Sequence, residues 1–210
     1  MTKPTLVLPK TIRFPEENEV PMNSSVLERL RESKNANIVP GYVFKPKDDN
    51  PDNIDLPFEF YAEINIDNPQ LWSLIITLSE ETLPENCALI FGYIDSEINY
   101  GFYENKFEIL KYLEDYKTEL IHDTLLIWGL IYHDNENLTE IYVDESKYLK
   151  YWGNNEEKFR NIMNHFNLSE IENLEFIDEY PKVRENINLH FENITETGEL
   201  IETLRQTYVI

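Results

Sequence analysis

The chain has 210 residues, with 18 basic and 40 acidic side chains and a formal net charge of −22. A surface this acidic repels nucleic-acid phosphates and attracts basic proteins, which argues against direct binding of DNA or RNA. The aromatic content of 13% indicates a folded core rather than an acidic disordered chain. The single cysteine excludes an intramolecular disulfide, and no apolar run suits a secretory signal or a bilayer-spanning helix. We therefore expect a cytoplasmic protein without a membrane partner.

Residues 1–57 look like an irregular, proline-rich leader, because they hold eight of the eleven prolines in the chain. The first 50 residues are close to neutral, with 8 basic and 7 acidic side chains, which leaves 10 and 33 for the rest. Within the leader, a helical pattern covers 24–33, with Ser25 and Glu28 at the spacing of a capping box. Residues 45–55 form a polar, turn-rich connector. We predict that 58–210 form a single α+β domain.

The first half of this domain alternates strand and helix patterns. Residues 58–66 alternate apolar and polar side chains, as a half-buried strand does, and Asp67-Asn68-Pro69 starts a helix that Pro84 ends. The run 87–94 is apolar enough for a strand buried on both faces. Residues 98–103 are its expected hairpin partner, and Asn105 caps a helix that runs to about 121.

The second half repeats this alternation less clearly. The expected elements are a second central strand at 124–132, its hairpin partner at 138–143, a segment at 146–152 that suits either strand or helix, a helix capped by Asn155, a short helix with the capping-box pair Ser169 and Glu172, a strand at 186–191 and a last helix at 199–208.

Two segments of the centre share one pattern. Ile90-Phe91-Gly92 and Ile127-Trp128-Gly129 are each followed by an acidic turn, a strand-like run and a helix-like run. We expect a duplicated β-β-α unit here, although a short match of common residues also arises by chance. The predicted fold is one α+β domain: a mixed, largely antiparallel sheet with helices packed on one face.

No segment carries a recognisable catalytic, metal or cofactor motif. The four histidines are scattered without the i, i+4 spacing of a helical zinc site, and Cys87 fits a small buried apolar side chain. Six glycines form no phosphate-binding loop. We therefore predict no catalytic residue, no metal and no cofactor. Two alternatives stay open: a small enzyme whose pocket holds at least two acids with raised pKa values, and an acidic adaptor protein without catalytic activity.

Aromatic and acidic side chains interleave in the second hairpin and the segment after it. The predicted partner-binding residues are Asp134, Glu136, Glu140, Tyr142, Asp144, Glu145, Tyr151 and Trp152. Aromatic anchors ringed by carboxylates suit an interface for a basic protein. In the alternative interpretation, the aromatic rings fill the core and the acids solvate the hairpin edge. The oligomeric state is open, and a homodimer is one option.

A compact, acidic, cysteine-poor α+β domain with Trp128-Gly129 in a central strand and acidic hairpins resembles the immunity proteins of bacterial polymorphic-toxin systems. The resemblance covers residues 58–168. It implies a protein that binds a cognate basic toxin, such as a nuclease, and occludes it. It identifies no individual binding residue.

Overall fold

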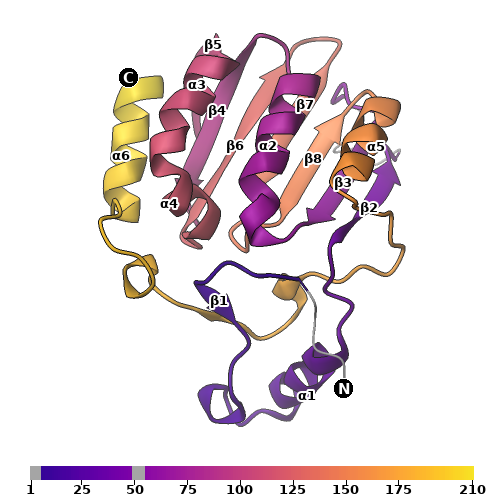
Figure 1. Cartoon of the computed structure of the whole chain (residues 1–210), viewed down its shortest axis with the longest axis vertical. Coiled ribbons are helices and arrows are strands. Elements are labelled where there is room, and N and C mark those ends of the chain that lie inside the picture. The colour runs from indigo at the N-terminus through magenta and orange to yellow at the C-terminus, as the bar shows by residue number, and fades with distance from the viewer. Residues whose placement is uncertain (1–5, 49–54) are drawn as a thin grey trace.

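A computed structural model describes residues 6–48 and 55–210, and a seven-stranded sheet organises them (Figure 1). In spatial order its strands are β2 (Gly41–Pro46), β3 (Phe60–Asn65), β8 (Leu149–Gly153), β7 (Leu138–Val143), β6 (Leu126–His133), β4 (Asn86–Tyr93) and β5 (Asn99–Asn105). Strand β7 is central, with three strands on each side. The predicted α+β class is confirmed. The sheet is not mixed, however, because every pair of neighbouring strands in it is antiparallel.

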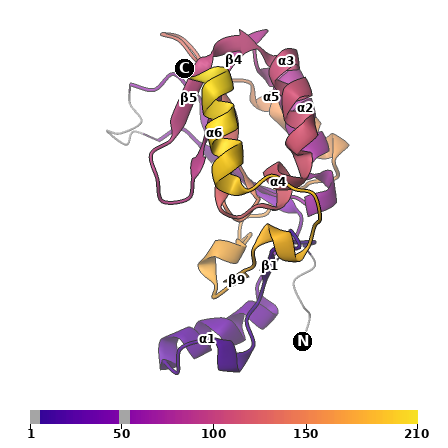
Figure 2. The same cartoon turned by 90° about the vertical axis from the view of Figure 1, so that its left-hand side faces the viewer.

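Five helices cover one face of this sheet. They are α2 (Asn68–Thr82), α3 (Lys106–Leu113), α4 (Lys117–His122), α5 (Glu156–His165) and α6 (Thr197–Tyr208). Seen from the side, α2 and α3 lie together on one side of the strands (Figure 2). Alternate strand residues pack against these helices, among them Phe91 and Trp128, which are both fully buried. The Trp128 indole donates a hydrogen bond of 3.0 Å to the Leu120 carbonyl, so burial leaves its polar atom satisfied.

Two of the three N-cap side chains predicted for the helices on the sheet accept the expected backbone hydrogen bond. Asn105 accepts a hydrogen bond from the Phe107 amide at 3.0 Å, and Asn155 accepts one from the Lys158 amide at 2.9 Å, as predicted. Asp67 precedes α2, but its carboxylate accepts from the Val7 amide instead of capping the helix.

Two predicted capping boxes are wrong. Helix α1 (Ser24–Glu32) is capped by Asn23, which accepts from the Ser25 amide at 2.9 Å, so the cap lies two residues before the expected one. Ser169 and Glu172 start no helix. The Ser169 carbonyl instead accepts from the Tyr42 amide, because this segment runs beside the edge strand β2.

The two matching central segments lie side by side. Strands β4 and β6 pair so that Phe91 is opposite Trp128, while Ile90 is opposite Gly129 and Gly92 is opposite Ile127. Strand β5 extends the sheet beyond β4, and β7 extends it beyond β6, so the four strands have an approximate twofold arrangement about the Phe91–Trp128 pair. The second copy departs from a β-β-α unit because β8 comes before its helix, α5.

The segment predicted as an irregular leader is largely built into the fold. Strand β2 completes one edge of the sheet, and β1 (Ile12–Arg13) pairs with β9 (Val183–Arg184) below it, beside α1 (Figures 1 and 2). A small second core joins the two chain regions there, formed by Ile12, Ala36, Ile38, Ile177 and Tyr180. Of the predicted 45–55 connector, Lys45 and Pro46 belong to strand β2. Residues 49–54 lie outside the described residues.

Short 3-10 turns complete the chain. They are η1 (Glu17–Glu19), η2 (Ser33–Asn35), η3 (Glu114–Tyr116), η4 (Ile177–Glu179) and η5 (Ile187–Leu189). The last of these replaces the strand predicted at 186–191. The ambiguous segment at 146–152 contains strand β8, and the predicted last helix is α6.

Candidate functional site: the open face of the sheet

The face of the sheet opposite the helices carries two complete rows of side chains. Residues paired across neighbouring strands point to the same face, so the strand register gives both rows directly. The first row is Lys45, Tyr61, Trp152, Glu140, Ile131, Ala88 and Tyr103. The second row is Val43, Glu63, Lys150, Tyr142, Gly129, Ile90 and Tyr100. We call these two rows the open face.

No helix in the described parts of the chain packs on the open face. One corner is covered, because Leu174 and Phe176 cluster with Tyr148 and with Val43 of the second row. At the other end Tyr100 is 61% exposed and Tyr103 is 49% exposed. The open face therefore keeps large aromatic surfaces in contact with solvent.

Most charged groups of the open face have a partner within the chain. Lys45 contacts Glu63 at 3.3 Å, and Lys150 contacts Asp144 at 2.6 Å. The Tyr61 and Trp152 rings pack with their centroids 4.7 Å apart. Burial, followed by the nearby Glu63 carboxylate, raises the pKa of Tyr61, so its hydroxyl keeps its proton at neutral pH.

Glu140 is the exception. Its row neighbours are Ile131 and Trp152, and its carboxylate forms no hydrogen bond or ion pair with any residue that the structure describes. Burial raises the pKa of Glu140 to about 7, because the surroundings disfavour the charged form. Burial therefore favours the protonated form of this carboxyl group.

The eight predicted partner-binding residues do not lie on one surface. Glu140, Tyr142 and Trp152 lie together on the open face, as the rows show. Tyr151 points to the helix side and is 1% exposed, so its prediction as a surface residue is wrong. It packs on Phe159 of α5 instead, with ring centroids 5.2 Å apart.

The predicted acidic residues other than Glu140 lie in two separate places. Asp134 and Glu136 are exposed in the β6–β7 turn, where the Asp134 carboxylate accepts hydrogen bonds of 2.8 Å from the amides of Glu136 and Asn137. Tyr132 and these amides lower the pKa of Asp134. Asp134 thus organises its own turn, and Glu136 is the freer acid.

Asp144 and Glu145 belong to a cluster of acids at one end of the sheet. The third member is Asp178, and one carboxylate oxygen of each lies within 4.8 Å of the others. Each acid has its own cation, since Asp144 pairs with Lys150, Glu145 with Arg184 and Asp178 with Lys182. We assign this cluster a structural role, so reversing the charge of Asp144 or Glu145 would disturb the fold.

A shallow cavity of about 230 Å³ adjoins Trp152 and Tyr61 on the open face. Lys45 and Phe58 also line it. A cavity of this size beside two aromatic rings can accept one or two side chains of a docked protein, as pockets at the centre of interfaces do.

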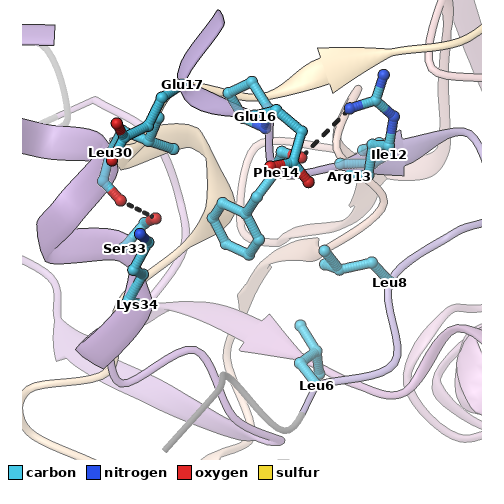
Figure 3. Close-up of a pocket in the computed structure, with 11 residues that line it drawn as sticks. Leu6, Leu8, Ile12, Arg13, Phe14, Glu16, Glu17, Leu30, Ser33 and Lys34 are labelled. Carbon is cyan, nitrogen blue, oxygen red and sulfur yellow. Dashed lines mark hydrogen bonds between the residues drawn. The ribbon is translucent and has the colours of Figure 1, made fainter. Parts of the chain in front are cut away.

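A second cavity, of about 470 Å³, lies below the sheet between β1 and α1 (Figure 3). Leu6, Leu8 and Phe14 line it, together with polar groups of which Arg13 and Ser33 are already paired. Arg13 contacts Glu19 at 2.7 Å and Glu185 at 2.8 Å, and the Ser33 hydroxyl donates to the Leu30 carbonyl. This cavity offers apolar volume and two charged side chains, Glu17 and Lys34, that form no hydrogen bond or ion pair with any residue that the structure describes.

Sequence patterns did not single out Tyr61, Tyr100 and Tyr103 as site residues. The alternation of 58–66 does place Tyr61 on the outward face of its strand, and 98–103 was the expected hairpin partner of the central strand. What the sequence lacks is the strand order, which brings these residues into rows with Glu140 and Trp152.

The alternative of a carboxylate enzyme requires a second acid beside Glu140. The positions diagonal to Glu140 on β6 and β8 of the open face include Gly129 and Lys150, and neither supplies one. That alternative stays a hypothesis without an identified pair of acids.

No helix among the described residues is both long enough and apolar enough to cross a membrane. In comparisons with known proteins, no family model, no curated protein and no solved structure matched the chain.

Proposed function

We propose that the chain is a binding protein that docks a basic protein partner on its open face. In line with the resemblance to immunity proteins, we propose that this partner is a toxin, such as a nuclease, which the bound chain occludes. One observation carries the proposal: a sheet face that no helix of the described residues covers, and that holds five aromatic residues, belongs to a molecule with a net charge of −22.

The composition of the open face supports a docking role. An antiparallel sheet that faces water on one side ordinarily alternates apolar residues inward with polar residues outward. Here the outward rows carry Tyr, Trp, Ile and Ala at most positions of β4 to β8; Ala88 and Ile90 are buried, and Tyr100 and Tyr103 are exposed. Aromatic residues are enriched at the centres of protein interfaces, and large exposed apolar patches are uncommon on proteins that bind nothing.

Charge favours a basic protein over a second copy of the chain. Residues 51–210 hold 33 acidic and 10 basic side chains, so two copies repel each other, whereas a basic partner is attracted from a distance. Association with a basic partner should therefore slow and weaken as the salt concentration rises.

The test compares variants in quantitative capture from a lysate of the organism that makes the protein. Trp152→Ser and Tyr100→Ser each remove an aromatic ring from the open face. Phe107→Ser is the matched control, because Phe107 is 51% exposed on α3, on the helix side. We expect one basic protein to be retained by the wild type and Phe107→Ser, and to be lost from the open-face variants and at high salt.

Circular dichroism establishes that each variant is folded. Equal retention by all four proteins would rule out the open face as the docking surface. Sedimentation of the isolated chain covers the homodimer: a dimer that Trp152→Ser dissociates would assign the face to a second copy instead.

A further inference from the structure

The open face also indicates which chemistry of the partner it recognises. We propose that Glu140 receives a cationic side chain of the basic partner, with arginine preferred over lysine, and that Trp152 and Tyr142 flank the bound cation. This inference rests on the proposed function and names the partner group that the same face binds.

Position is the first argument. Glu140 lies on β7, the central strand, with three strands on either side. Residues that dominate binding cluster near the centre of an interface, where docking removes water most completely. A partner that covers the open face must cover Glu140.

The second argument is the pattern of ion pairs around it. Glu63 in the second row contacts Lys45, and Asp144 at the end of β7 contacts Lys150. The cations of both rows are thus engaged by these two acids, and Glu140 has no cation among the described residues. We therefore infer that the cation bound by Glu140 comes from another molecule.

The third argument is the aromatic surroundings. Trp152 is directly opposite Glu140 on β8, and Tyr142 follows on the same face of β7. Aromatic faces attract cations, and the planar guanidinium of arginine stacks on a ring while it donates two hydrogen bonds to one carboxylate. The ammonium of lysine is not planar, so it cannot stack on a ring while it donates two parallel hydrogen bonds to one carboxylate. For this reason we expect arginine to bind more tightly than lysine.

The fourth argument is that ionised Glu140 does not stabilise the folded protein. The pKa of Glu140 is raised to about 7, so ionising this carboxyl at neutral pH opposes folding. A bound guanidinium would favour the ionised form and bring the pKa of Glu140 back down. Binding of the cation and ionisation of Glu140 are therefore linked.

The test uses small probes and isotope-labelled protein in solution. N-acetyl-arginine amide is titrated into the chain, with the uncharged citrulline analogue and the lysine analogue in parallel. We expect a saturable change at the Trp152 indole and the Glu140 carboxyl for arginine, at least tenfold weaker binding of citrulline, and an intermediate result for lysine. The pKa of Glu140 should fall as arginine is added.

Glu140→Gln keeps the shape of the side chain and removes its charge, and should weaken arginine binding at least tenfold. Glu108→Gln is the matched control, because it removes one exposed acid from α3 on the helix side of the sheet and should leave binding unchanged. The proposal fails if arginine gives no saturable change, if citrulline binds equally well, or if both variants behave alike.

The two proposals can fail separately. If Glu140→Gln loses the arginine probe's response but Trp152→Ser still captures the partner fully, the docking function is wrong although the cation site exists. If Trp152→Ser loses the partner while Glu140→Gln keeps both the partner and the probe, the docking face stands and the role of Glu140 is wrong.

Discussion

At the scale of single residues, a carboxyl group that burial holds partly neutral has a measurable effect on folding. The pKa of Glu140 is about 7 in the fold and near 4.5 without burial, so the folded state binds the extra proton between these values. Its contribution to stability is fully present below pH 4.5 and is lost as the pH rises through 7.

We therefore predict that Glu140→Gln raises the free energy of unfolding at pH 8 by about 1–2 kcal/mol and changes it little at pH 4.5. Urea denaturation at the two pH values measures the difference, with Glu136→Gln as the control. A variant less stable than the wild type at pH 8 would contradict the burial argument. A gain in stability with a loss of binding is typical of a residue kept for function.

His122 has the opposite dependence on pH. Its ring packs on Phe191 with centroids 4.6 Å apart, and burial, with Lys10 and Lys147 nearby, lowers its pKa to about 4. The fold keeps this imidazole neutral, so its contribution is present above pH 6.5 and lost as the pH falls toward 4.

The predicted result is that the wild type loses more stability between pH 7 and pH 5 than His122→Gln does. Thermal unfolding in matched buffers measures both proteins. Parallel pH profiles would show that His122 is protonated in the fold at pH 5.

Residue patterns explain why Tyr151 was predicted, wrongly, as a surface residue beside Trp152. The two are adjacent aromatic residues on one strand, and either could fill a core. Only the pairing of Tyr151 with Ile141 and Ala62 decides that it faces the helices. The pairing of Glu145 with Arg184 joins residues 39 positions apart, which no local pattern reveals.

At the scale of elements, the close contact between β6 and β7 depends on a glycine. A Cβ atom at Gly129 would lie 2.3 Å from the Ile141 carbonyl oxygen and 3.0 Å from the Tyr142 Cα. Both atoms belong to the backbone of β7, so the strands themselves would have to separate.

Gly129→Ala should therefore lower the free energy of unfolding by about 2–3 kcal/mol. Gly198→Ala is the control, because no atom lies within 4 Å of a Cβ added at this position of α6, and alanine favours a helix by about 0.5–1 kcal/mol. Chemical denaturation of both variants gives the comparison, and equal stabilities would contradict it.

Long elements are predictable because their apolar side chains recur with the period of the element, two residues in a strand and about 3.6 in a helix. Strand β3 and helices α2, α3 and α5 follow their patterns closely. Strand β2 was missed, because it lies among prolines and ends at Pro46. It is held by pairing with β3 and by the segment after α5, which are contacts made in the folded chain.

At the scale of the whole molecule, 40 acidic against 18 basic side chains make the folded state repel itself. Ion pairs such as Arg13–Glu19 at 2.7 Å are exposed and contribute little. Salt screens the repulsion, since the Debye length falls from about 30 Å at 0.01 M to about 10 Å at 0.1 M.

We expect the melting temperature to rise by a few degrees between these two ionic strengths, and to rise equally in sodium and potassium chloride. Differential scanning calorimetry at each ionic strength measures the change. A melting temperature that falls with added salt would mean that the ion pairs outweigh the repulsion.

The overall layout follows from composition and pattern, but the placement of the two chain regions below the sheet does not. The pairing of β1 with β9 joins two-residue strands, which are too short for any periodic signal. The order of strands in the sheet, and with it the open face, is also a property of the assembled fold.

The β1–β9 pair has a consequence for synthesis on the ribosome. Arg13 bonds Glu185, 172 residues further along the chain, so the first segment cannot reach its final place until almost all of the described chain has been made. Its apolar residues, such as Ile12 and Ile38, are exposed during that time. Folding that must wait for such distant contacts is slow, and the exposed apolar segment is prone to aggregate before its permanent neighbours are translated.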